Sequence, residues 1–188
     1  MAPRPLARVL TDALNPFVIF TVLFFAVALA QSPLPRAIMY AGVELLAAAA
    51  VAGFVLLTRR RARVGDFWIS ARAERLTPAV FLVSAFVALL AALFLLGAPT
   101  DLLLLTLSMG LASATVTLLT LLFKASAHCT VAGHAATAGI LLLGPPGILF
   151  LPVLPLVIWS RVALGAHTIP EALAGAVVGV GFALFFLL

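Results

Sequence analysis

The sequence of 188 residues contains few of the charged side chains that cover a soluble protein. Lys, Arg, Asp and Glu make up 9% of it and hydrophobic residues 65%, whereas a typical soluble domain has about 25% charged and about 45–50% apolar residues. Mean hydropathy is +1.30. Because a water-soluble fold of this size could not bury so much apolar surface, the composition excludes a soluble enzyme, a secreted disulfide scaffold and a disordered chain. Most of the chain is expected to lie in lipid.

Cysteine and acidic residues are scarce as well. Cys129 is the single cysteine, which excludes an intrachain disulfide and a metal site built from several thiolates. The six Asp and Glu residues include no cluster of carboxylates suited to a divalent cation. The sequence therefore predicts no metal and no other cofactor, and Cys129 is interpreted as a small core residue.

Long apolar runs fill most of the chain, and a helix needs about 20 apolar residues to cross the bilayer core. The candidate spans are 13–32, 37–58, 78–97, 101–123, 128–143, 148–164 and 169–188. The predicted fold class is all-α, a polytopic membrane helix bundle of six to seven transmembrane helices with short loops. The fifth and sixth spans are short, so they are expected to be tilted, partly re-entrant or sheltered by their neighbours.

The connections between the spans are too short to hold a soluble domain, so we expect a single transmembrane domain over 1–188. Residues 1–100 would form the N-terminal helices and a basic loop, and 101–188 the helices that carry the candidate site. The beginning of the chain has an alternative interpretation as a cleaved signal peptide, because Arg4 and Arg8 precede an apolar run that ends in Ala-Leu-Ala. Since further spans follow, we expect an uncleaved first helix.

Basic residues are distributed unevenly between the two ends of the predicted bundle. Arg36 alone falls at one end; the other end holds Arg4, Arg8, Arg59, Arg60, Arg61, Arg63, Arg72, Arg75, Lys124 and Arg161. This asymmetry places the basic end in the cytoplasm. The run at 59–63 is interpreted as an anchor on anionic headgroups, with substrate contact as the alternative. The net charge of +5 therefore needs no nucleic-acid partner.

Two short polar segments fall at this basic end, separated by a helical hairpin. Each contains a cation, a hydroxyl group and a histidine, and the second also contains a carboxylate. The residues are Lys124, Ser126 and His128 in the first segment, and Ser160, Arg161, His167 and Glu171 in the second. Because the hairpin returns the chain to the same end, we expect these side chains to form one cluster.

The chemistry of this predicted cluster suits a tetrahedral oxyanion such as phosphate. Fixed cations, hydroxyl groups and helix N-termini all favour such an anion. Two imidazoles suit a displacement at phosphorus, in which one attacks and the other protonates the departing oxygen. Glu171 follows His167 by four residues, a spacing at which a carboxylate can accept the ring N–H and select the tautomer.

The two segments resemble motifs of the type 2 phosphatidic acid phosphatase superfamily, whose three motifs are Lys-x6-Arg-Pro, Pro-Ser-Gly-His and Ser-Arg-x5-His-x3-Asp. The third is matched by Ser160-Arg161-x5-His167-x3-Glu171, with Glu in place of Asp. The second resembles Ala-Ser-Ala-His at 125–128, which keeps the Ser and the His. The resemblance covers about 124–171.

The resemblance implies that His167 is the nucleophile that forms a phosphohistidine and that Glu171 orients it. It implies that His128 is the acid for the leaving alcohol. The expected phosphate-binding residues are Lys124, Ser126, Ser160 and Arg161. No Lys-x6-Arg-Pro precedes His128, so either Lys124 or the loop residues Arg72 and Arg75 would supply the missing cations. This departure is similar to short bacterial members of the superfamily.

The function implied is that of an integral membrane phosphatase of the bacterial cytoplasmic membrane, with its site on the cytoplasmic side. Its substrate would be a lipid phosphate monoester or diphosphate: a polyprenyl phosphate or diphosphate, which is slightly favoured, phosphatidic acid or phosphatidylglycerol phosphate. The expected partners are this lipid and the surrounding membrane lipids. One alternative is a transporter or lipid-binding protein without hydrolysis, with Glu44 and His134 as coupling groups. Another is a degenerate family member with a structural role.

Several polar residues also have a structural interpretation. Thr168 and Glu171 form a capping-box pattern. His134 is expected to be buried and hydrogen-bonded. Glu44, inside the second span, needs a partner or a protonated state; it would make a structural hydrogen bond, or line a lipid or proton path. The charged residues at 66–75 are expected to form a solvated loop network, with a contribution to the site as the alternative.

Overall fold

The computed structural model describes residues 4–60, 76–120 and 123–188. Its elements are α1 (Arg4–Ala13), α2 (Pro16–Gln31), α3 (Leu34–Arg60), α4 (Leu76–Leu95), α5 (Thr100–Leu119), α6 (Ala127–Leu143), the 3-10 helix η2 (Pro145–Phe150), α7 (Val153–Ala163) and α8 (Ile169–Leu187). The described residues contain helices and no strands. The all-α prediction is therefore confirmed for this part of the chain.

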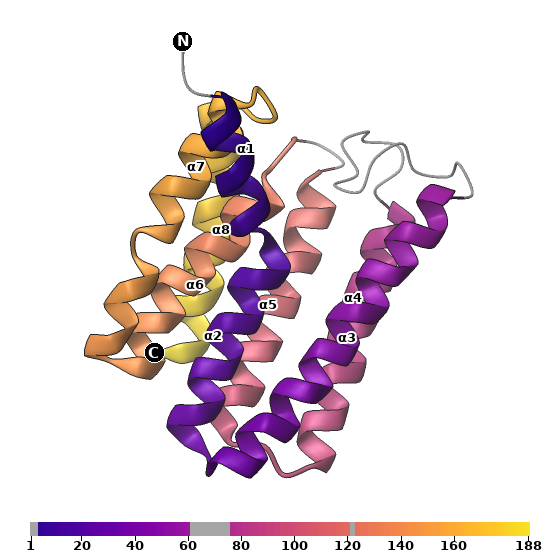
Figure 1. Cartoon of the computed structure of the whole chain (residues 1–188), viewed down its shortest axis with the longest axis vertical. Coiled ribbons are helices and arrows are strands. Elements are labelled where there is room, and N and C mark those ends of the chain that lie inside the picture. The colour runs from indigo at the N-terminus through magenta and orange to yellow at the C-terminus, as the bar shows by residue number, and fades with distance from the viewer. Residues whose placement is uncertain (1–3, 61–75, 121–122) are drawn as a thin grey trace.

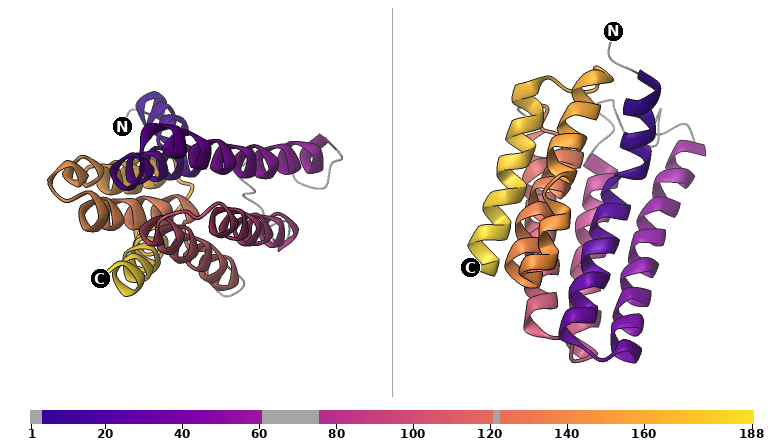
Figure 2. Two further views of the ribbon diagram at one scale, coloured as in Figure 1. Left: turned by 90° about the horizontal axis from the view of Figure 1, so that it is seen from below. Right: turned by 60° about the vertical axis from the view of Figure 1, so that its left-hand side comes forward.

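The helices lie roughly along one long axis, and the chain reverses direction between α2 and α3, α3 and α4, α4 and α5, and α5 and α6, whereas α1 continues into α2 with a bend of 44° (Figure 1). Helices α6, α7 and α8 gather on one side of the bundle and α3 and α4 on the other (Figure 2). Helices α2 and α3 meet at the end away from the N-terminus and separate toward the end that carries it (Figure 1).

The number of helices long enough to cross a membrane is lower than the predicted six to seven. Within the described residues, four stretches qualify: Leu34–Thr58, Thr100–Leu119, Pro145–Ala163 and Ile169–Leu187. A fifth is added if α1 and α2, which meet at an angle of 44°, count as one bent span. Val80–Leu95 in α4 and α6 itself are apolar but shorter. The structure thus supports a membrane helix bundle with four to five candidate spans.

The first predicted span, 13–32, is wrong at its beginning. Asn15 caps α2, its side-chain oxygen accepting a hydrogen bond from the Val18 N–H at 3.1 Å, and Pro16 occupies the first turn. A proline at that position removes a backbone donor that a continuous helix would need. The chain therefore breaks there, and the preceding residues form the separate helix α1, which packs against α7.

Helices α6 and α8 approach each other closely enough for their backbones to touch. A Cβ atom added at Gly175 would collide with the carbonyl oxygen of Ser126, and one at Gly179 with that of Thr130. Small residues permit this approach, which stabilises helix pairs in lipid through close packing. The contact fixes the beginning of α6 against the first turns of α8.

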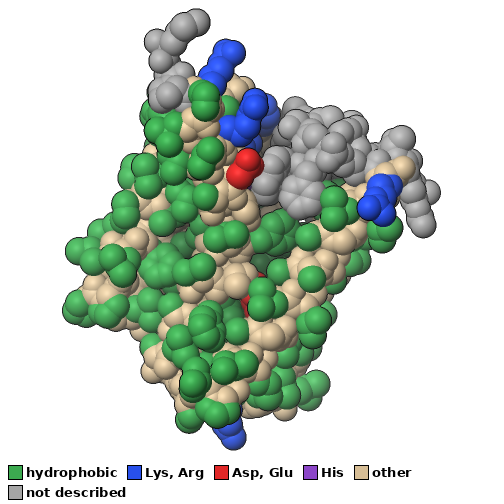
Figure 3. All heavy atoms as spheres, viewed as in Figure 1, with side chains coloured by type: hydrophobic (Ala, Val, Ile, Leu, Met, Phe, Trp, Pro, Cys, Tyr) green, Lys and Arg blue, Asp and Glu red, His purple; other side chains and the backbone are tan. Residues whose placement is uncertain are grey.

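The described basic residues keep the predicted asymmetry. Arg4 begins α1, Arg60 ends α3 and Arg161 lies in the last turn of α7, all at the N-terminal end of the bundle, whereas Arg36 lies at the opposite end. Figure 3 shows Lys and Arg side chains gathered mainly at that end and an apolar surface along the length of the bundle. Such a surface is suited to contact with lipid.

Candidate active site

The two polar segments lie side by side, as the hairpin predicts. The Lys124 Nζ donates a hydrogen bond of 2.9 Å to the carbonyl oxygen of Ala166, across 42 residues of sequence. The backbone N–H of Ser126 donates to the carbonyl oxygen of Glu171 at 3.1 Å. The first bond joins the segment before α6 to the loop between α7 and α8, and the second joins it to the first turn of α8.

The turn after α7 directs the chain back toward Arg161. The backbone N–H groups of Ala166 and His167 both donate to the Arg161 carbonyl oxygen, at 3.0 and 3.3 Å. Gly165 has a φ of +68°, a left-handed conformation that glycine adopts without a Cβ clash. His167 is therefore held next to Arg161 by backbone bonds as well as by sequence.

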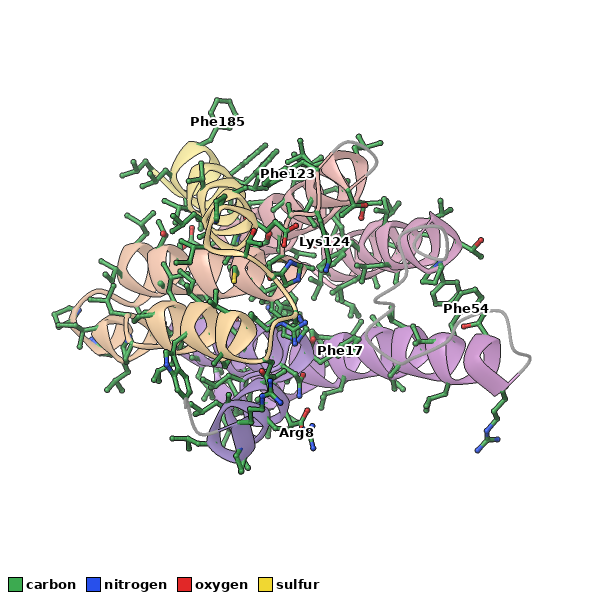
Figure 4. The ribbon with its side chains drawn as sticks, turned by 90° about the horizontal axis from the view of Figure 1, so that it is seen from above. Arg8, Phe17, Phe54, Phe123, Lys124 and Phe185 are labelled. Carbon is green, nitrogen blue, oxygen red and sulfur yellow. The ribbon has the colours of Figure 1, made fainter. Side chains whose placement is uncertain are left out.

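A cavity of about 260 Å³ connects this end with the interior of the bundle. His128, Arg161 and His167 line it together with apolar residues of α2, α3, α4 and α5. His128 and Arg161 are 6% and 8% exposed. In Figure 4, viewed from the N-terminal end, Phe17 and Lys124 lie on either side of side-chain nitrogen atoms that gather near the centre. The cavity thus has a cationic, histidine-bearing end and otherwise mainly apolar walls.

Burial is the largest cause that lowers the pKa of His167, followed by the positive charges of Arg161 and Lys124, whereas Glu171 acts in the opposite direction; together they set this pKa at about 4. The imidazole is therefore neutral at pH 7 and has a lone pair available. Its Nδ1 lies 3.5 Å from Glu171 Oε2. A carboxylate on Nδ1 favours the tautomer in which Nε2 carries that lone pair.

Glu171 also completes the predicted capping box of α8. Its Oε2 accepts a hydrogen bond of 2.9 Å from the backbone N–H of Thr168, and its own N–H donates to the Thr168 hydroxyl at 3.5 Å. The same Oε2 is the atom that faces His167. The structural and the positioning interpretations of Glu171 are therefore compatible.

The two predicted serines lie beside the cavity and take part in backbone contacts. Ser126 caps α6 by accepting from the Cys129 N–H at 3.4 Å. Ser160 donates to the Val157 carbonyl at 2.9 Å and accepts from the Thr11 hydroxyl at 3.1 Å. Both serines have no exposed surface and neither is among the residues that line the cavity. Phosphate binding by Ser126 or Ser160 stays a prediction.

The other predicted residues fall in different places. His134 is fully buried with its Nε2 2.7 Å from the Ser108 hydroxyl, which confirms the expectation of a buried, hydrogen-bonded histidine. Glu44 has the expected partner, the hydroxyl of Thr21. Arg72, Arg75 and the rest of the loop at 66–75 lie outside the described residues. In the part of the chain that the structure describes, no group of three His, Cys, Asp or Glu residues is arranged to hold a metal ion.

Sequence reasoning missed the role of α1 and the extent of the cavity. The Thr11 hydroxyl reaches Ser160, next to Arg161, so an N-terminal helix packs directly behind the site. The pair Asn15 and Pro16, a cap followed by a first-turn proline, is the sequence signal that separates α1 from α2. The cavity had no comparable signal, because its walls come from six helices, α2 to α7.

Comparisons with known proteins give no match. No protein-family model, no curated protein and no solved structure matches this chain.

Proposed function

We propose that this chain is a membrane phosphatase that hydrolyses a lipid phosphate monoester or diphosphate through a phosphohistidine on His167. The observation that carries the proposal is the cavity, which combines His128, His167 and Arg161 at one end with mainly apolar walls below. A phosphorylated lipid has the same division into an anionic head and an apolar tail. The cationic end matches the head, and the walls match the tail.

Binding of the head group would depend on Arg161 and Lys124. A guanidinium group donates two parallel hydrogen bonds to phosphate oxygens. Lys124 lies close enough to lower the pKa of His167, so its positive charge also acts on a phosphate bound beside His167. The proposed roles of these cations are to hold the phosphate and to keep His167 unprotonated.

The first step transfers phosphorus from the lipid to the protein. The neutral His167 Nε2 attacks phosphorus, and the bond from phosphorus to the leaving oxygen breaks. Burial and the charge of Arg161 lower the pKa of His128 to about 3 in the free protein. The negative charge of the bound phosphate raises this pKa, so that His128 takes up a proton on binding and gives it to the leaving oxygen. Glu171 stabilises the positive charge that develops on the His167 ring through Nδ1. The products are phosphohistidine and the lipid alcohol, or phosphohistidine and the lipid monophosphate when the substrate is a diphosphate.

The second step regenerates the protein. Neutral His128 removes a proton from water, the oxygen attacks phosphorus, and the phosphorus–nitrogen bond to His167 breaks. Inorganic phosphate leaves, His167 is neutral again and His128 is protonated for the next turnover. General acid–base catalysis of this kind contributes about 10²–10⁴-fold.

The proposed setting is the cytoplasmic membrane of a bacterium, with the basic end in the cytoplasm. The asymmetry between that end and the end that holds Arg36 supports this orientation. Candidate substrates are phosphatidic acid, phosphatidylglycerol phosphate and polyprenyl phosphates or diphosphates, since each has a phosphate head and a long apolar tail.

The test is phosphate release by the purified full chain in detergent, screened over these lipids. We expect release from at least one lipid, and loss of release in His167→Ala. The exposed Arg60→Ala is the control for Arg161→Ala, because both remove a guanidinium from the same end of the bundle and only Arg161 lines the cavity. Tight lipid binding by folded protein without release from any lipid would contradict the proposal and favour transport or lipid binding.

A further inference from the structure

A carboxyl group lies deep in the same cavity, well away from the proposed phosphate site. Glu44 of α3 is 3% exposed and lines the cavity that His128 and Arg161 also line. The Thr21 hydroxyl of α2 lies 3.0 Å from both of its carboxyl oxygens. The walls of this cavity also include the apolar side chains of Leu89 and Met109.

The contact with Thr21 leaves most of the hydrogen-bonding capacity of Glu44 unused. One hydroxyl group donates one proton, whereas a carboxyl group has about four acceptor positions and, when protonated, one donor. Among the described residues, Thr21 is the one side chain placed on the Glu44 carboxyl. A polar group surrounded by apolar side chains is stabilised when a further partner binds it.

The helices fix how far this carboxyl group lies from the head-group end. The Thr11 hydroxyl contacts Ser160, the neighbour of Arg161, and Thr21 follows Thr11 by ten residues. A helical rise of about 1.5 Å per residue gives at most about 15 Å between the two levels. The bend of 44° between α1 and α2 makes the distance somewhat shorter.

The surface of the bundle is hollowed between the two helices that carry Glu44 and Thr21. Figure 3 shows a hollow between α2 and α3 on the face that it views. A lipid chain that extends from the head-group end into the cavity would pass between these helices at the level of Glu44 and Thr21. The Glu44 carboxyl group would then contact the hydrocarbon chain of the lipid.

We propose that Glu44 is a second polar binding point for the ligand, and that the preferred ligand carries a hydroxyl group on its apolar chain about 10–15 Å from its phosphate. The inference rests on the proposed function for the head group. It names a substrate class, hydroxylated long-chain phosphates, over unsubstituted chains. An unsubstituted polyprenyl or alkyl chain leaves Glu44 with Thr21 alone and is the weaker ligand.

The experiment compares two matched probes, octadecyl phosphate and the same alkyl phosphate with one mid-chain hydroxyl group. Binding to the full chain in detergent is measured by calorimetry, and phosphate release is measured separately. One additional hydrogen bond corresponds to about a three- to tenfold tighter Kd for the hydroxylated probe. We expect Glu44→Gln, which keeps an acceptor, to retain the preference and Glu44→Leu to lose it.

Ser113→Ala is the control, because Ser113 lines the same cavity from α5 and its loss should leave the preference unchanged. Equal Kd values for the two probes in the wild type would overturn the inference without any variant, as would a preference that survives in folded Glu44→Leu. A preference for the hydroxylated probe, with no phosphate release from either probe or from any lipid of the screen above, supports Glu44 as a binding point and overturns the phosphatase proposal. Release from both probes without a preference overturns the inference alone.

Discussion

The Lys124 ammonium group donates a 2.9 Å hydrogen bond to the Ala166 carbonyl oxygen, one residue before His167. The contact joins the cation of the first polar segment to the loop that presents the proposed nucleophile. Lys124 is half-buried, so its charge is only partly screened by solvent. One side chain thereby holds the loop and adds positive charge to the site.

Replacement of Lys124 by Met tests this double role. The variant loses a hydrogen bond from a charged donor, which we expect to reduce the free energy of unfolding by about 1 kcal/mol at a partly exposed position. Phosphate release should fall by about tenfold or more, because the phosphate also loses a cation. Lys124→Arg keeps the charge and should retain more activity. Equal activity of the Met variant and the wild type would remove Lys124 from the site.

The protonation of His167 provides a second prediction. Its pKa of about 4 predicts that phosphohistidine formation declines as the pH falls toward 4. In Arg161→Gln the pKa of His167 should rise, because a nearby positive charge is lost, but stay below 6.5, because burial remains the larger cause. An NMR titration of the imidazole signals measures the pKa of His167 in the wild type and in the variant. An unchanged pKa in the variant would place Arg161 away from His167.

The lowered pKa of His167 also makes the free energy of unfolding depend on pH. The folded chain binds this proton near pH 4 and the unfolded chain near pH 6.5. The stabilising effect of keeping His167 neutral is therefore fully present above pH 6.5 and is lost as the pH falls through 4. Chemical denaturation of wild type and His167→Asn over this range should show a smaller acid loss in the variant.

Substitutions of Glu171 and Thr168 distinguish the helix-capping role of Glu171 from its role in orienting the nucleophile. Gln is accepted at the third position of a capping box, so Glu171→Gln should leave the free energy of unfolding nearly unchanged and lower kcat. Thr168→Ala removes the cap and should cost about 0.5–2 kcal/mol, with a smaller effect on kcat. If Glu171→Gln keeps full kcat, the carboxylate acts only as a cap.

The close approach of α6 and α8 predicts different effects for two glycines of α8. Gly175→Ala places a methyl group against the Ser126 carbonyl, whereas the same change at Gly181 meets open space. We expect Gly175→Ala to cost about 1–3 kcal/mol through overpacking and to lower phosphate release, because it displaces the segment that carries His128. Gly181→Ala should change neither thermal stability nor release. Normal stability of Gly175→Ala would contradict the backbone contact.

The helices could be predicted from the sequence because each long apolar run has to lie in lipid or in a protein core. The break before α2 was missed because the interpretation followed hydropathy alone, although Asn15 and Pro16 carry a start signal. The prediction of 128–143 agrees with α6 within one residue, yet this helix is shorter than those counted as spans. Hydropathy locates apolar helices well and gives a less secure count of membrane crossings.

The meeting of the two polar segments was also predictable, because a helical hairpin returns the chain to the same end. The contacts that position them were not. Thr11 reaches Ser160 across almost the whole sequence, and Lys124 binds a backbone carbonyl, which carries no sequence signal. The shared cavity of Glu44 and His128 depends on how α2 and α3 diverge, a tertiary property.

The most direct measurement of the central claim is capture of the phosphorylated protein. The full chain is mixed with a lipid carrying radiolabelled phosphate, quenched rapidly in alkali, and its peptides are mapped by mass spectrometry. The account predicts an acid-labile phosphate on His167 that is absent from His167→Asn. Phosphate release by the wild type with no label on His167 at any time would contradict it.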